Sequence, residues 1–191
     1  DVGDEAVAAS VVRPLTGLKV AIHYGCHLLK PSRVMQVDDP DDPHLMERLV
    51  TALGAEHVRH RNWSLCCGKA CQNEDIPNNM MHDLLGSVHD EKADVLGMIC
   101  PTCFGQFDHG QARIAKRFEE DFHTPSLYYV QLLAFAQGVP YDELGVETLD
   151  QLEVGTGLVG GSPQPGHDLG VELVVDLLEG EGLALHLEAR D

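Results

Sequence analysis

The chain has 191 residues, enough for one domain with a buried core, and 43% of them are apolar, which excludes a globally disordered chain. Its 31 acidic residues outnumber the 13 basic ones and give a formal net charge of −18. Such a surface repels phosphate backbones and anionic lipid headgroups, so we expect neither nucleic acid nor a membrane surface as a partner. A solvated acidic surface explains the charge, and a docking face for a basic partner subunit is the alternative.

The sequence also indicates where the protein works. No apolar run approaches the ~20 residues that span a bilayer, so we expect no direct membrane insertion. Residues 1–5 lack the positive and apolar regions of a signal peptide, which favours a cytoplasmic protein. Six cysteines in a chain without an export signal favour metal or redox use over a disulfide framework.

The hydrophobic pattern predicts strands that alternate with helices, after an N-terminal arm or linker over residues 1–16. Short apolar runs predict strands at 18–23, 56–61, 95–99 and 126–129. Helical periodicity predicts helices at 44–53, 77–93, 104–118 and 130–137. This alternation is typical of a layered α/β domain, a sheet with flanking helices, which we place at residues 17–150. An extra C-terminal segment, residues 151–191, begins as a Gly/Pro-rich linker and has no assigned role.

Five of the six cysteines fall at the end of a predicted strand or in the loop beyond it: Cys26, Cys66, Cys67, Cys100 and Cys103. Neighbouring strand ends of an open α/β sheet converge on one crevice, so three distant segments can bring five sulfurs together. Thiolates are soft ligands that suit iron–sulfur clusters and zinc. A structural zinc ion needs only four ligands, and the adjacent Cys66 and Cys67 suit a larger centre approached from two directions, so the pattern favours a multinuclear cluster.

This cysteine pattern leaves three hypotheses open. The first is an iron–sulfur oxidoreductase domain in which the five cysteines are ligands rather than nucleophiles. The second is a zinc-binding or metal-free interaction module that docks onto a redox complex without doing chemistry. The third is a dithiol oxidoreductase acting through Cys100 and Cys103, which is weaker because thioredoxin-like sites need no Cys-Cys-Gly triplet.

Three segments carry a more specific pattern: Tyr24-Gly25-Cys26-His27, Cys66-Cys67-Gly68 and Cys100-Pro101-Thr102-Cys103. Together they resemble the cysteine-rich CCG domain of the heterodisulfide reductase B-subunit family, and the single cysteine set resembles the second of that family's two CCG halves. The resemblance implies a [4Fe–4S]-type cluster, non-cubane, held by the five cysteines. It also implies reduction of a disulfide, which in methanogens is the mixed disulfide of coenzyme M and coenzyme B, or electron transfer within a larger complex.

The implied partners are other redox subunits that carry iron–sulfur clusters or flavin, together with a small disulfide or thiol substrate. No GxGxxG motif follows a predicted strand, so we expect the electrons to come from such a subunit rather than from a soluble dinucleotide.

Four further residues lie close to the cysteines in the sequence. His27, Lys30 and Lys69 could stabilise a negatively charged cluster or protonate a leaving thiolate, and solvated or capping roles are the alternative. Cys71 stands outside the five-cysteine pattern. A small buried residue explains it, and a resolving thiol or an alternative ligand is the other interpretation.

Overall fold

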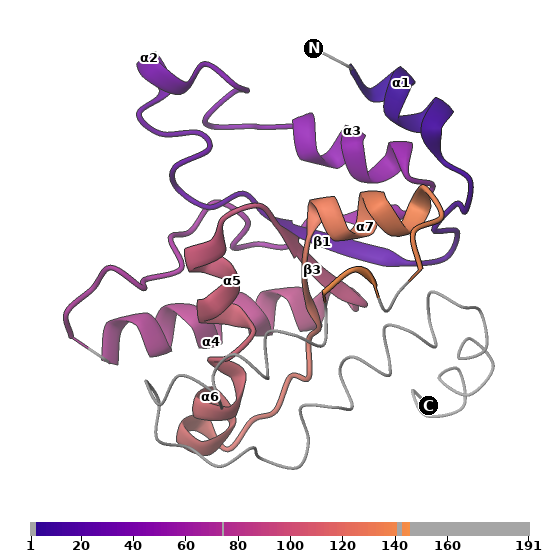
Figure 1. Cartoon of the computed structure of the whole chain (residues 1–191). Helices are drawn as coiled ribbons and strands as arrows, with labels where there is room; N and C mark the ends of the chain where they lie inside the picture. The colour runs from indigo at the N-terminus through magenta and orange to yellow at the C-terminus, as the bar shows by residue number, and fades with distance from the viewer. Residues whose placement is uncertain (1–2, 74, 141–142, 146–191) are drawn as a thin grey trace.

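The computed structural model describes residues 3–73, 75–140 and 143–145 (Figure 1). The linker and C-terminal segment predicted over residues 151–191 lie outside these described residues. Within them the chain forms a parallel sheet with helices on both faces, which confirms the predicted α/β class. Among the described helices, none combines the length and the apolar character that a bilayer-crossing helix requires.

The sheet has four parallel strands in the order β2-β1-β3-β4. The strands are β1 (Lys19–His23), β2 (Glu56–Val58), β3 (Val95–Met98) and β4 (Ser126–Tyr128). All four residues of β3 are buried, as its continuous apolar run predicts for a parallel strand that is covered on both faces. In the pairing of β1 with β3, His23 lies opposite Met98 at the carboxyl ends of both strands.

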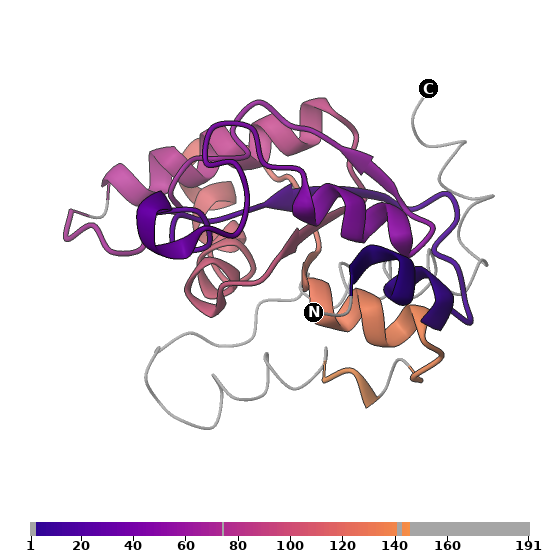
Figure 2. The ribbon, with the colours of Figure 1, turned by 90° about the horizontal axis from the view of Figure 1, so that it is seen from above.

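Two layers of helices enclose this sheet (Figure 1, Figure 2). One face is covered by α1 (Gly3–Ser10), α3 (Leu45–Ala52) and α7 (Tyr129–Ala136). The other is covered by α4 (Asp75–Asp90), α5 (Pro101–Phe107) and α6 (Gln111–Phe118). A short helix, α2 (Ser32–Met35), lies in the long loop between β1 and α3.

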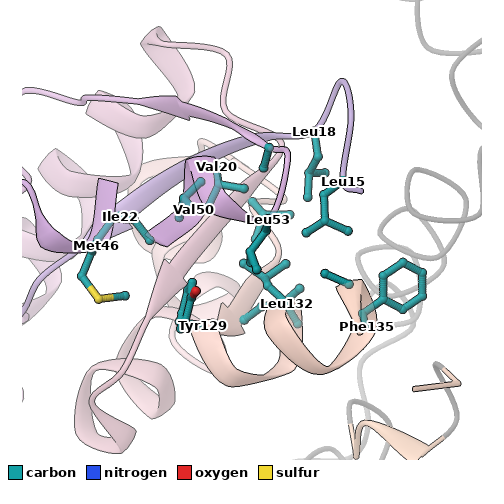
Figure 3. Packing of buried hydrophobic residues seen from close by; sticks show 14 of the residues in the cluster. Leu15, Leu18, Val20, Ile22, Met46, Val50, Leu53, Tyr129, Leu132 and Phe135 are labelled. Atoms are coloured by element: carbon teal, nitrogen blue, oxygen red, sulfur yellow. The ribbon is translucent and has the colours of Figure 1, made fainter. Parts of the chain in front are cut away.

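The hydrophobic core consists of two clusters, one on each face of the sheet. Alternate residues of β1 divide between them: Val20 and Ile22 pack against α3 and α7 (Figure 3), whereas Ala21 packs with residues of α4 and α5. Fully burying an aliphatic or aromatic side chain stabilises a fold by about 1.5–3 kcal/mol. Both clusters therefore hold β1 in a fixed position, with its carboxyl end at one edge of the molecule.

β1 is also the point at which the chain changes direction across the sheet. From β1 the chain crosses to β2 on one side, and later to β3 and β4 on the other. In open parallel sheets, the loops that leave two such neighbouring strands diverge and open a crevice at their carboxyl ends. The candidate residues lie at this edge.

The segment predicted as an arm or linker, residues 1–16, contains a helix that the sequence did not predict. In α1 the side chain of Val7 packs on the core cluster that contains Val20 and Ile22. Beyond α1, the backbone N–H groups of Val12 and Arg13 both donate to the carbonyl oxygen of Ala136, each at 2.8 Å. The small, polar and acidic residues suggested an arm or linker, but the alanines of this segment favour a helix, and Val7 and Val11 contact the core.

The single helix predicted over 104–118 is wrong, because two helices occupy this region. α5 begins at Pro101, in the first-turn position that proline favours, and ends at Phe107. A Cβ on Gly110 would collide with the carbonyl oxygen of Gln106, so the tight passage from α5 to α6 requires glycine. The early start of α5 places Cys103 in its first turn.

Candidate metal centre

Three loops at the carboxyl edge of the sheet bring the cysteines together. Cys26 follows β1, Cys100 follows β3, and Cys103 lies in the first turn of α5. Cys66 and Cys67 lie in the loop that joins β2 to α4. Because β1 lies between β2 and β3 in the sheet, these three loops are neighbours in space, as predicted.

The five thiols contact one another, and all are free rather than paired in disulfides. The thiol of Cys26 hydrogen-bonds with Cys66. Cys67 hydrogen-bonds with both Cys66 and Cys103, and Cys103 also hydrogen-bonds with Cys100. A continuous chain of sulfur contacts therefore runs from Cys26 to Cys100 through all five residues.

These contacts change the acidity of the thiols. The hydrogen bond between Cys103 and Cys67 lowers the pKa of Cys67 to about 6, and it raises the pKa of Cys103. Burial, followed by the proximity of Cys66, raises the pKa of Cys26. Of these two thiols, Cys67 therefore ionises first, and the thiolate is the form that binds metals.

The backbone after the cysteine pair also points at sulfur. The N–H of Gly68 donates to Sγ of Cys66 at 3.4 Å, and the N–H of Lys69 donates to the sulfur of Cys67. Gly68 has a φ of +78°, and a Cβ there would lie 2.8 Å from the Cα of Pro77. Only glycine fits this turn, so the third residue of the Cys-Cys-Gly triplet is required by the geometry that directs both N–H groups to sulfur.

Two aromatic side chains border the group on the side of β4. The ring of Tyr128 stacks on that of Phe104, with centroids 4.5 Å apart and an interplanar angle of 12°. Burial, followed by the nearby Cys100, raises the pKa of Tyr128. Neither residue was predicted as part of the site, and only their positions beside Cys100 and Cys103, at the end of a strand and the start of a helix, could have indicated it.

The residues predicted near the cysteines are exposed. His27 and Lys30 lie in the loop after β1, where the N–H of Lys30 donates to the carbonyl oxygen of Cys26 at 3.0 Å. The side chain of Lys69 is exposed, and its contribution to the cysteine group is the backbone N–H. Cys71 is exposed rather than buried, and it lies outside the chain of sulfur contacts in the described part of the protein.

Within residues 3–73, 75–140 and 143–145, no group of three or more His, Cys, Asp or Glu side chains is arranged to hold a metal ion. The donor set nevertheless suits a sulfur-ligated centre: it offers five free thiols, two backbone N–H donors to sulfur, and a Gly25 whose missing Cβ would lie 3.4 Å from Sγ of Cys103.

Comparison with known proteins agrees with this donor set. Residues 20–108 match a family model described as CCG, cysteine-rich domain. The chain carries a CCG domain. The matched range includes all of the five cysteines that the thiol contacts connect, and it extends from β1 to the end of α5.

Relatives of this CCG domain are parts of redox enzymes. The chain is 35% identical over 151 residues to the B subunit of a ferredoxin/F420H2-dependent CoB-CoM heterodisulfide reductase of Methanosarcina acetivorans, covering 77% of this chain and 50% of that protein. It is 36% identical over 149 residues to the B subunit of a ferredoxin:CoB-CoM heterodisulfide reductase of Methanosarcina mazei (76% and 49%). It is 31% identical over 144 residues to an 8-methylmenaquinol:fumarate reductase membrane anchor subunit of Wolinella succinogenes (74% and 51%).

These matches confirm the resemblance to the heterodisulfide reductase B-subunit family that the three cysteine segments predicted. The chain spans about half the length of the curated relatives it matches. The CCG domain is therefore similar to about half of each of these redox-enzyme subunits.

Proposed function

We propose that this CCG domain is an iron–sulfur oxidoreductase domain that reduces a disulfide, or relays electrons, within a multi-subunit complex. The observation that carries the proposal is the continuous contact of five free thiols from three loops at one edge of the sheet. The proposed ligands are Cys26, Cys66, Cys67, Cys100 and Cys103, and the proposed group is a [4Fe–4S]-type cluster, non-cubane. The names of the relatives support a heterodisulfide as the substrate class and ferredoxin-linked or other redox subunits as partners.

The residues around the cysteines have definable roles in this reaction. Reduction of a disulfide consumes two electrons and two protons and releases two thiols. A bound iron–sulfur cluster supplies one-electron storage at a site that attracts sulfur ligands. The N–H groups of Gly68 and Lys69 stabilise the negative charge on the thiolates, because hydrogen bonds to the charged form favour it. The exposed His27, Lys30 and Lys69 side chains are available to attract an anionic substrate or to protonate a departing thiolate.

The working compartment follows from the same chemistry. We place the protein in the cytoplasm, where reducing conditions keep cysteines available for metal binding. The acidic surface, with its formal charge of −18, favours companion subunits that present basic docking patches.

Metal analysis of anaerobically purified protein tests the ligand set. We expect several iron atoms with a matching amount of sulfide, and we expect Ser substitution of Cys66, Cys67, Cys100 or Cys103 to remove most of both. Cys71→Ser is the matched control, since the exposed Cys71 lies outside the sulfur contacts, and it should keep iron and colour. One zinc ion, or no metal, would favour an interaction module instead, and iron loss in the Cys71 variant would show that the ligand set is wrong.

A second assay tests the dependence on partners. The isolated chain should release no thiol from a disulfide when supplied with NADH, whereas an artificial one-electron donor should reduce its cluster. Thiol release from NADH at catalytic rates without an added protein would identify a self-contained enzyme and refute the proposed dependence on companion subunits.

A further inference from the structure

His23, the last residue of β1, is buried without a partner. Its side chain is 1% exposed, and neither Nδ1 nor Nε2 has a hydrogen-bond partner within the described residues. Burial, followed by the proximity of His60, lowers the pKa of His23 to about 3, so the imidazole is neutral and carries one N–H donor. Buried polar groups in folded proteins almost always have partners, so this imidazole indicates a partner that the described chain does not supply.

His60 shows that the fold provides partners for a buried histidine where only structure is needed. It is also 1% exposed, and it lies beside β1 and α4. Its Nδ1 hydrogen-bonds with Oγ of Ser87 at 2.9 Å, and its Nε2 with the carbonyl oxygen of Ile22 at 3.2 Å. Two neighbouring histidines therefore have equal burial but opposite hydrogen-bonding states.

The surroundings of His23 place it next to the cysteine group. Side chains two residues apart on a strand share a face, so His23 lies on the same face as Ala21, which packs in the cluster that contains Cys67 and Cys103. The ring of His23 meets that of Phe107 edge-on, with centroids 4.8 Å apart. Cys103 and Phe107 are four residues apart on one side of α5, about 6 Å apart along its axis. The imidazole therefore lies on the side of the sheet that carries Cys67 and Cys103, against the same helix as Cys103.

We infer that the ring N–H of His23 donates a hydrogen bond to sulfur in the bound iron–sulfur cluster or in the thiolates that hold it. The inference rests on the proposed function, because the acceptor arrives only with the bound group. A donor to sulfur stabilises the more negative, reduced state, so His23 acts as a positioning residue that raises the reduction potential. Nothing about the spacing of His23 in the sequence marks it as part of the site.

The test compares three variants of the full chain, each purified anaerobically with its cluster. His23→Phe keeps an aromatic ring but removes the N–H, whereas His23→Gln keeps an N–H donor. His60→Phe is the matched control, because it removes an equally buried imidazole whose partners are known. The readouts are iron content, the midpoint of a redox titration followed by electron paramagnetic resonance, and the coupling of histidine nitrogen to the reduced cluster in a ¹⁵N-histidine-labelled protein.

We expect His23→Phe to shift the midpoint to a more negative potential, while His23→Gln and His60→Phe stay near the wild-type value. The histidine-nitrogen coupling should disappear in His23→Gln and persist in His60→Phe. A wild-type midpoint in His23→Phe with full iron content would overturn the inference. If His23→Phe does not fold, a coupling that is absent from the wild type or survives in His23→Gln would overturn it. A wild-type chain without iron would refute the proposed function itself, so the two failures are distinguishable.

Discussion

Replacing His60 with Phe should change how the stability of the chain depends on pH. Burial is the main reason that the pKa of His60 is lowered from 6.5 to about 4 in the folded chain. Between these two pH values the unfolded chain binds a proton that the folded chain excludes, so the free energy of unfolding falls as the pH falls below 6.5. Each pH unit corresponds to about 1.4 kcal/mol, which gives a loss of about 3 kcal/mol by pH 4.

The His60→Phe variant cannot bind this proton when it unfolds, and its folded state also lacks the two hydrogen bonds of His60. At pH 7.5, His60→Phe should be less stable than the wild type by about 1–3 kcal/mol, because the hydrogen bonds of His60 with Ser87 and with the carbonyl oxygen of Ile22 are lost. As the pH falls from 6.5 to 4.5 this difference should shrink by about 2–3 kcal/mol, since only the wild type has to exclude the proton from His60. Urea unfolding of the reduced, metal-free chain at several pH values measures it. A stability difference that stays constant over this pH range would refute the assignment of His60 as a buried neutral imidazole.

The remaining predictions concern a turn, a helix start and the C-terminal segment. Gly68→Ala should destabilise the chain by about 2 kcal/mol or more and reduce its iron content, since φ at Gly68 is +78° and a Cβ would lie 2.8 Å from Pro77 Cα; unchanged denaturation midpoints would contradict this. Asp38→Ala should lower the free energy of unfolding by about 1 kcal/mol, because Asp38 accepts hydrogen bonds from two backbone N–H groups at the start of α3. Thermal unfolding measures that loss, and an equal midpoint would exclude a capping role. Truncation after residue 150 should preserve the circular dichroism spectrum and the bound iron, because all five proposed ligands precede it; an insoluble product would show that the removed segment packs on the core.

The cysteine group was predictable because its signals are local. The continuous apolar run of β3 leads to Cys100, and the partly alternating run of β1 leads to Cys26, so the strand ends and the thiols appear together in the sequence. The parallel sheet then brings these ends to one edge whatever the lengths of the helices between them. The positions of the thiols therefore required no knowledge of side-chain packing.

Features that depend on contacts between distant segments were not predictable in this way. The helix in residues 3–10 is held by contacts such as that of Val7 with the core, and the break before α6 depends on a collision at Gly110 that only the folded chain reveals. Tyr128 belongs beside the cysteines because its ring stacks on Phe104. The missing partner of His23 likewise depends on which atoms surround it, and the sequence alone does not contain that information.

The hydrogen bonds from Val12 and Arg13 to Ala136 have a consequence for how the domain opens locally. They join the segment that precedes β1 to the last turn of α7, and both lie near the amino end of β1, as Leu15, Leu18 and Phe135 show in Figure 3. Segments that are held together by such bonds open together, because opening one of them removes the contacts of the other. The amide protons of α1 and α7 should therefore exchange with solvent as one unit, while the opposite edge, where the cysteines lie, keeps its contacts.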